Sequence, residues 1–208
     1  MYKKKKNIIA GRNPVLEGLQ QGSGIDKVLL YKSATGDAVQ QIKELAQKFQ
    51  VPVQYVPMEK LNQLTNVQHQ GVVAFRAVVH YLDLQQVVDF LNEQGEVPLM
   101  FILDGITDVR NIGAIARTAV CCGVQALIIP DKGVAALGED AMKSSAGALE
   151  HVHICRVSSL MKAVDLLHLN GIKVYASEMT ADTLLHQLPL TEPCAIVMGS
   201  EDKGVFGG

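Results

Sequence analysis

Apolar positions along the chain recur at two spacings, one typical of amphipathic helices and one typical of buried strands. In the first third, the pattern predicts helix at 14–21, strand at 27–31, helix at 38–50, strand at 53–56, a short helix from Met58 and strand at 71–77. We interpret this segment as a compact α/β unit of about 70 residues, which is near the small end for an independent domain.

The remainder of the chain shows a second alternation of elements. The pattern predicts helix at 84–94, strand at 99–103, helix at 111–122, strands at 126–129 and 152–155, helix at 159–169, and strands at 173–176 and 195–198. Strands that are continuous apolar runs between helices indicate a parallel sheet covered on both faces. We therefore expect one domain at 1–79, a linker at 80–98 and a second domain at 99–208.

Two polar, glycine-rich loops follow strands of the predicted parallel sheet, at 104–113 and at 199–204. Ligands in such sheets bind outside the carboxyl ends of the strands. A dinucleotide-binding turn needs GxGxxG, but Gly105 and Gly113 are too far apart for it, and no GxxxxGK phosphate loop is present. These spacings disfavour a nucleotide-dependent oxidoreductase.

The first loop leads into DGITDVRNIGAIARTA (104–119), whose apolar stripe has helical spacing. Asn111 stands where a helix N-cap is expected, and Gly113 is expected to let the helix approach the strands closely. Packing explains the stripe but not Arg117, which projects from its flank. The second loop, GSEDKG (199–204), is by itself also typical of an ordinary acidic turn.

Charge and cysteine content narrow the class of protein. The net charge of -2 excludes a uniformly basic nucleic-acid binder, and the basic excess lies near the N-terminus in Lys3–Lys6 and Arg12. Those lysines suit either phosphate contacts or a solvated tail. We expect the four cysteines, including Cys121 and Cys122, to be reduced and buried. The sequence shows neither a signal peptide nor an 18-residue apolar run, which predicts a cytoplasmic protein.

The residues resemble a known family at five places. NIGAIAR (111–117) and GSEDKG (199–204) are similar to the NxGxxxR and GxExxG motifs of SpoU-type RNA ribose 2'-O-methyltransferases, and SSAGALEHV (144–152) also resembles that family. AGRNPVLEGL (10–19) and HQGVVAF (69–75) resemble the small substrate-binding domain fused to such enzymes. The resemblance covers nearly the whole chain.

This resemblance implies the fold, the reaction and the partners. It implies a ribosomal-protein-like α/β domain that binds RNA, followed by a parallel-sheet SPOUT methyltransferase domain with a trefoil knot. The implied reaction moves a methyl group from S-adenosylmethionine to a ribose 2'-hydroxyl, most simply of a guanosine in large-subunit (23S) rRNA. The implied assembly is a homodimer, with no metal and no membrane partner. A tRNA enzyme and a non-catalytic RNA-binding protein of the same fold remain the alternatives.

The resemblance also implies roles for individual residues. The catalytic residues would be Asn111, Arg117 and Glu201. The cofactor-binding residues would be Gly199, Glu201, Gly204 and Ser177, and the RNA-binding residues Arg12, His69, Gln70 and Arg110. Three of these residues have a simpler interpretation from the residues alone: Glu201 as part of a turn, Ser177 as the end of a strand, and His69 as a structural histidine before a strand.

The guanidinium of Arg117 limits the chemistry that this residue can perform. Family proposals make this arginine the general base, but a guanidinium with a pKa above about 12 is a poor base. We expect it mainly to hold an RNA phosphate and to stabilise alkoxide character on the attacking oxygen.

The sequence departs from the family pattern in two places. Val109 follows Asp108 where the family usually has proline, which affects only the rigidity of that turn. A third motif, which normally follows GxExxG and completes both the adenosine cradle and the knot, does not precede the final Gly207-Gly208. We therefore expect this chain to be a truncated or partly ordered version of a longer protein.

Overall fold

The computed structural model describes residues 8–21, 24–49, 51–135, 137–201 and 204–205. The chain divides into two compact units, 1–80 and 81–208, and each contains a sheet of its own. The basic cluster Lys3–Lys6 lies outside the described residues.

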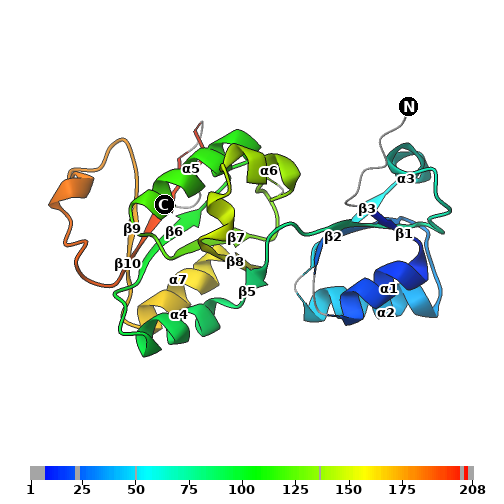
Figure 1. Ribbon diagram of the computed structural model, residues 1–208, viewed down its shortest axis with the longest axis horizontal. Helices are drawn as coiled ribbons and strands as arrows, with labels where there is room; N and C mark the ends of the chain where they lie inside the picture. Colours follow the sequence, from blue (N-terminus) through cyan, green and yellow to red (C-terminus); the bar gives the residue numbers. More distant parts are fainter. Residues whose placement is uncertain (1–7, 22–23, 50, 136, 202–203, 206–208) are drawn as a thin grey trace. The chain divides into compact units, whose positions relative to one another are not determined.

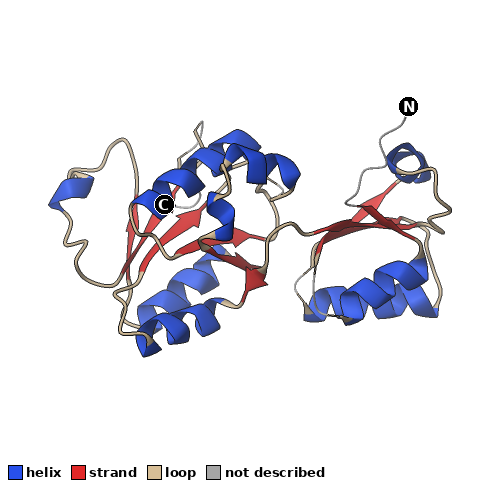
Figure 2. Cartoon of the chain, viewed as in Figure 1, coloured by secondary structure: helices blue, strands red, loops and turns tan. Residues whose placement is uncertain are grey.

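The first unit is a four-stranded mixed sheet with helices on both faces. Its strands are β1 (Ile8–Ala10), β2 (Ile25–Tyr31), β3 (Val53–Val56) and β4 (Val72–Arg76), in the order β1-β4-β2-β3. β4 runs antiparallel to β1 and β2, whereas β3 runs parallel to β2. Helices α1 (Arg12–Gln20) and α2 (Asp37–Lys48) cover one face, and α3 (Met58–Leu64) covers the other (Figure 2).

Alternating side chains of β2 supply both cores of this unit. Val28 and Leu30 pack among residues of α1 and α2, whereas Leu29 packs with Leu61 of α3. Because both faces are covered, the middle of the strand, Val28 to Leu30, is a continuous apolar run. The pattern missed β1, since three residues are too few to display a strand period.

The second unit is a six-stranded sheet in which every neighbouring pair is parallel. The order is β5-β8-β7-β6-β10-β9. The strands are β5 (Tyr81–Leu82), β6 (Leu99–Leu103), β7 (Ala126–Pro130), β8 (His153–Val157), β9 (Lys173–Ala176) and β10 (Cys194–Met198). The predicted parallel sheet is therefore confirmed.

Helices cover both faces of this sheet (Figure 1). Helices α4 (Leu84–Glu93) and α7 (Leu160–Leu169) lie on one face, and α5 (Val109–Cys121) lies on the other with α6 (Glu139–Ser144) and the short 3-10 helix η1 (Ala148–Glu150). A second 3-10 helix, η2 (Leu185–Gln187), interrupts the connection from β9 to β10. The pattern missed α6, which is shorter than two turns.

The segment predicted as a linker, 80–98, is mostly part of the second unit. β5 pairs with β8, and α4 buries Leu84, Val88 and Leu91 in the core that also contains Met100 and Ile102 of β6. The segment therefore builds the sheet edge and one helical layer instead of only connecting two domains.

The expectation that all four cysteines are buried was partly wrong. Cys155 and Cys194 are buried, but Cys121 and Cys122 are exposed, at the end of α5 and directly after it. Met161 and Met179 are also on the surface, 68% and 105% exposed. The two buried cysteines both lie on strands of the second sheet, β8 and β10.

Candidate active site

The two polar loops singled out in the sequence lie side by side at the centre of the second sheet. They follow β6 and β10, which pair in parallel so that Leu103 is in register with Met198. The Asp104 amide donates a hydrogen bond to the Met198 carbonyl at 2.9 Å. A Cβ built on Gly105 would lie 3.4 Å from the Ser200 Cβ, so the first residues of the loops are in contact.

The strand order reverses at this place. After β6 the chain continues to β7 and β8 on one side, and β9 and β10 then occupy the other side. In open parallel sheets, such a switch point is where ligand crevices form at the carboxyl ends of the strands. The two loops therefore occupy the position in this fold that is best suited to a ligand.

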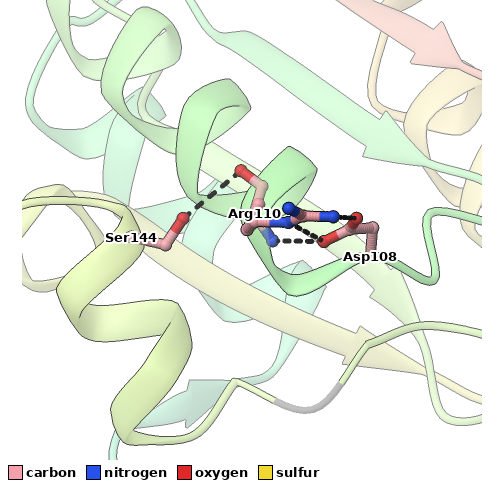
Figure 3. Close-up of polar contacts among 3 residues, drawn as sticks. All are labelled: Asp108, Arg110 and Ser144. Carbon is pink, nitrogen blue, oxygen red and sulfur yellow. Dashed lines mark hydrogen bonds and ion pairs between the residues drawn. The ribbon is translucent and has the colours of Figure 1, made fainter.

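Helix α5 begins earlier than predicted, and its cap is a different residue. Asp108 is the N-cap: its side chain accepts a hydrogen bond from the Arg110 amide at 2.7 Å (Figure 3). Asn111 lies in the first turn of the helix and is exposed. The expectation that Asn111 caps the helix was wrong because Asp, an equally good cap, precedes it in the loop. The Asn111 side chain is consequently not committed to capping.

Asp108 also holds the side chain of Arg110, one of the predicted RNA-binding residues. The carboxylate accepts from the Arg110 guanidinium at 2.9 Å, and both groups are on the surface. This hydrogen bond from Arg110 keeps the pKa of Asp108 below its usual value, and the same contact raises the pKa of Arg110. Arg110 is therefore a fixed positive charge at the amino end of α5.

Gly113 serves a different contact from the one predicted. A Cβ at this position would lie 2.1 Å from the Ser144 Oγ and 2.6 Å from the Ser144 carbonyl carbon. The glycine thus allows the end of α6, not the strands, to approach α5. Ser144 Oγ donates to the Arg110 carbonyl at 3.3 Å and so ties α6 to the first turn of α5 (Figure 3).

Arg117 lies on the side of α5 that faces away from the core. Ile112, Ala116 and Ala119 of the predicted stripe are buried, whereas Arg117 is exposed. Among the residues that the structure describes, its guanidinium forms no hydrogen bond or ion pair. The arginine that packing did not explain is therefore available to a ligand.

The second loop is a tight turn that only glycine permits at its start. Ser200 and Gly204 exchange two backbone hydrogen bonds, each 2.9 Å long. A Cβ on Gly199 would lie 2.0 Å from the Gly204 carbonyl carbon, and Gly204 has a φ of 66°, a left-handed conformation that favours glycine. Glu201 is exposed at the tip. Asp202 and Lys203 of the GSEDKG segment lie outside the described residues.

Ser177 directly follows β9, the other neighbour of β10. Its amide and its hydroxyl both donate to the Val197 carbonyl, at 3.0 Å and 2.9 Å. The residue therefore extends the pairing of β9 with β10 and also stands at the rim formed by the loops after β6 and β10. Within the described residues, no hydrogen bond or ion pair joins Glu201 to Asn111 or Arg117.

The other three predicted RNA-binding residues form a separate group in the first unit. Arg12 Nε donates to the Gln70 carbonyl at 3.2 Å, and the Arg12 amide donates to Gln70 Oε1 at 3.4 Å. His69 is only 8% exposed, with Nε2 2.8 Å from Asn62 Oδ1 and Nδ1 accepting from the Gly71 amide at 3.1 Å. His69 is thus a structural support of this loop, and Arg12 and Gln70 form its surface.

Sequence reasoning missed Asp108 and Ser144 as members of the first site. A signal was present for Asp108, because an acidic residue just before an apolar helical stripe is a strong N-cap candidate. For Ser144 the only signal was its place in SSAGALEHV, since contact with α5 depends on how α6 packs. Within the described part of the chain, no helix is long and apolar enough to cross a membrane, and no group of three or more His, Cys, Asp or Glu is arranged to hold a metal ion.

Comparison with known families matches both units. Residues 98–206 match the SpoU rRNA methylase family, and residues 8–81 match the family described as RNA 2'-O ribose methyltransferase substrate binding. A TrmH family tRNA/rRNA methyltransferase of Bacillus subtilis, named as putative, is 34% identical over 197 residues, which are 95% of this chain and 79% of the relative. A similarly named protein of Staphylococcus aureus is 36% identical over 198 residues, covering 95% and 80%.

Solved structures with the same fold include two methyltransferases. The SpoU methyltransferase AviRb from Streptomyces viridochromogenes, in complex with AdoMet, superposes with a TM-score of 0.54 at 20% identity and covers 95% of this chain and 74% of its own. An rRNA methyltransferase from Sinorhizobium meliloti superposes with a TM-score of 0.53 at 18% identity, covering 96% and 73%. These likenesses support the fold of the chain.

The matches to both families fall on the two units that the structure separates, and the site at the carboxyl ends of β6 and β10 lies within the methylase match. The chain belongs to the SpoU (TrmH) family of S-adenosylmethionine-dependent RNA 2'-O-ribose methyltransferases.

Proposed function

We propose that this RNA methyltransferase modifies the ribose 2'-hydroxyl of a guanosine in large-subunit rRNA, using the loops after β6 and β10 as its active site. The observation that carries the proposed site is the direct contact of these loops, through the Asp104 amide and the Met198 carbonyl, at the switch point of a parallel sheet. The family match supplies the reaction. A tRNA substrate is the alternative.

The residues at the rim fit the cofactor S-adenosylmethionine, which supplies an electrophilic methyl group when bound. Gly199 lets the Gly204 backbone occupy the place where a Cβ would lie, so the two ends of the loop after β10 stay close together and leave room beside them for a flat adenosine. Ser177 places a further polar group at the end of β9. We assign cofactor binding to these three residues and to Glu201, whose carboxylate extends from the same turn.

The residues on α5 would act on the RNA. A ribose hydroxyl is a poor nucleophile at neutral pH, so the enzyme must hold it in line with the methyl group and stabilise developing negative charge on its oxygen. We assign Arg117 to the RNA phosphate and to that negative charge, because its guanidinium is exposed and unpaired among the described residues. The Asn111 side chain, freed from capping by Asp108, would orient the hydroxyl.

We assign electrostatic support of the RNA to Arg110 and Arg12. Arg110 is prepositioned by Asp108, so a phosphate that it binds meets an already ordered guanidinium. Arg12, in the substrate-binding unit, is ordered by the backbone and side chain of Gln70. We also assign to Glu201 the positioning of Asn111 or Arg117 once substrate is present.

We further propose that the enzyme works as a homodimer in the cytoplasm. Exposed apolar side chains in the connection from β9 to β10 support self-association: Met179 is 105% exposed, Leu184 57% and Leu185 55%. The four free cysteines support a reducing compartment. Sedimentation equilibrium tests the dimer directly, and a mass equal to one chain at micromolar concentration would contradict it.

The test of the proposed reaction is methyl transfer from radiolabelled S-adenosylmethionine to total rRNA and, in a parallel assay, to total tRNA. We expect label in large-subunit rRNA, and mapping of the modified ribose identifies the nucleotide. Label only in tRNA would replace the proposed substrate with the alternative. Absence of S-adenosylmethionine binding by calorimetry, together with no transfer to either RNA, would favour the non-catalytic RNA-binding protein.

A further inference from the structure

A polar hollow in the first unit has no role in the methyl-transfer site. It is an open depression with a volume of about 520 Å³, lined by α3 and the loop that leads into β4. That volume is within the range of small-ligand sites, about 300–1,000 Å³. The lining residues are Met58, Asn62, Thr65, Asn66, Val67, Gln68, His69, Gln70 and Gly71.

The chemistry of this lining selects a neutral, flat ligand. It contains four side-chain amides and no Lys, Arg, Asp or Glu, so neither a phosphate nor a metal cation would find a counter-charge there. The amides of Asn66 and Gln68 each offer a donor and an acceptor together, the pattern that recognises the edge of a nucleobase. Met58 and Val67 add apolar surface for the face of a base, and Val67 is 58% exposed.

The loop that forms the hollow is held in an unfavourable backbone conformation. Gln70 has a φ of 51°, which non-glycine residues seldom adopt, and such strain persists only where surrounding contacts enforce it. Those contacts are present: Arg12 Nε donates to the Gln70 carbonyl, and His69 accepts from the Gly71 amide. Since Nδ1 is an acceptor, Nε2 carries the ring hydrogen and donates to Asn62 Oδ1, which leaves the Asn62 NH2 group for another partner.

The charge next to the hollow complements a nucleotide. Arg12 contacts Gln70 at the border of the hollow, whereas the lining itself is uncharged. A base inside the hollow would therefore have its phosphate beside a guanidinium that Gln70 already orders. RNA recognition of this kind requires an unpaired base, because bases in a double helix do not present their faces to the protein.

We propose that the hollow formed by α3 and residues 65–71 binds one unpaired nucleobase of the RNA, with Asn66 and Gln68 contacting its edge and Arg12 its phosphate. This site rests on the proposed function in that the base belongs to the RNA substrate. It lies in the first unit and takes no part in methyl transfer, so it determines which RNA is held.

The test measures binding of the full chain to labelled nine-nucleotide single-stranded RNAs and to an abasic ribose-phosphate nine-mer of equal charge. We expect at least one RNA with bases to bind about tenfold more tightly than the abasic strand. The double variant Asn66→Ala/Gln68→Ala should remove that difference while leaving abasic binding and its salt dependence unchanged. Gln40→Ala, which removes an exposed amide on α2 in the same unit, is the matched control.

Two outcomes would overturn the proposal: equal binding of abasic and base-containing strands by the unaltered protein, or an unchanged base preference in the double variant. If the double variant has the same thermal unfolding midpoint as the Gln40→Ala control, misfolding is excluded. If its midpoint is lower, the single variants Asn66→Ala and Gln68→Ala are used instead. Cofactor binding and methyl transfer are measured on the same samples. If the unaltered protein transfers methyl groups normally but shows no preference for strands with bases, the proposed nucleobase site is wrong and the proposed function stands. If the unaltered protein shows that preference but transfers no methyl group, the proposed function is wrong and the nucleobase site stands.

Discussion

At the scale of single residues, Arg117 is the side chain whose position packing does not require. It lies on an exposed side of α5, with buried stripe residues on the opposite side. An arginine side chain offers a planar set of donors that matches phosphate and other anions, so charge stabilisation and phosphate binding are the roles that suit it. If Arg117 acts only through its charge, another positively charged side chain in its place should retain part of the activity.

Replacement of Arg117 distinguishes these roles. We expect Arg117→Lys to keep measurable methyl transfer across the pH range, and Arg117→Ala to lose about 10²–10³ in rate because a charge-stabilising donor is removed. The measurement is labelled methyl transfer at several pH values, with RNA affinity measured in parallel. A complete loss in Arg117→Lys with unchanged RNA affinity would support the general-base mechanism instead.

The four cysteines also differ from one another in a measurable way. Burial, with a smaller contribution from Asp83, raises the pKa of Cys155 to about 12, and burial raises the pKa of Cys194, while Cys121 and Cys122 are exposed. Since the thiolate is the reactive form, we expect a thiol reagent at pH 8 to modify Cys121 and Cys122 in the folded protein and the other two only after unfolding. Mass spectrometry of peptides identifies the modified positions, and rapid labelling of Cys155 in the native state would contradict the expectation.

The same pKa shift gives stability a pH dependence. The unfolded chain releases the Cys155 proton near its ordinary pKa of 9.0, whereas the folded chain holds it until about pH 12. The native state is therefore expected to lose stability as the pH rises from 9 towards 12, with no contribution from this group below pH 9. Urea unfolding of Cys155→Ala beside the unaltered chain separates this contribution, because the difference between the two proteins should shrink above pH 9.

At the scale of elements, the start of α5 determines how the first loop meets the site. Asp108 has extended backbone angles, φ −87° and ψ 123°, and Val109 is the first helical residue. Proline is favoured at the first helical position, and it requires extended backbone angles in the residue before it. The valine found where relatives with the family pattern have proline is thus compatible with the same turn.

Val109→Pro should therefore stabilise the chain. We expect a gain of about 0.4–1 kcal/mol in the free energy of unfolding, because proline restricts the unfolded chain without straining this turn. Chemical denaturation measures the change. Thr118→Pro, which places proline inside the same helix, is the contrasting variant and should destabilise by about 3 kcal/mol or more. A loss of stability in Val109→Pro would show that the helix start differs from the one described.

Some elements and contacts of the fold could be predicted from the sequence, and others could not. Long periodic segments such as α5 and continuous apolar strands such as β6 were predictable, because a helix face or a buried strand imposes its own spacing. The contact of Gly113 was not predictable, because a glycine indicates that another part of the chain packs closely against it but does not identify that part. Here it is Ser144 of α6 and not the sheet. For the site, the two loops were predictable from strand order, whereas the capping role of Asp108 required the helix start itself.

At the scale of the whole molecule, each unit has a separate sheet and separate core clusters. The cofactor site assigned above lies entirely in the unit 81–208. A ligand that binds only the folded form stabilises the part of the protein to which it binds, by about 2.7 kcal/mol at a hundred times its dissociation constant.

Calorimetry can test this assignment. We expect two thermal transitions for the full chain, with S-adenosylmethionine raising the midpoint of only one of them, and that one should match residues 81–208 by hydrogen exchange. The separately expressed unit 8–80 is the control and should unfold at the same temperature with and without the cofactor. A cofactor-dependent shift in that unit would contradict a site confined to the second sheet.

The position of β10 has a consequence for synthesis of the chain. β10 lies between β6 and β9 and pairs with both, yet it is made after both. On the ribosome, the facing edges of β6 and β9 therefore stay without a partner until residues 194–198 emerge, and open strand edges of this kind invite pairing with other chains. The described strands of the first unit all precede residue 81, so its sheet can form before the second unit is made. The nascent protein can therefore have a folded substrate-binding unit while the strand edges of the methyltransferase unit are still exposed to aggregation.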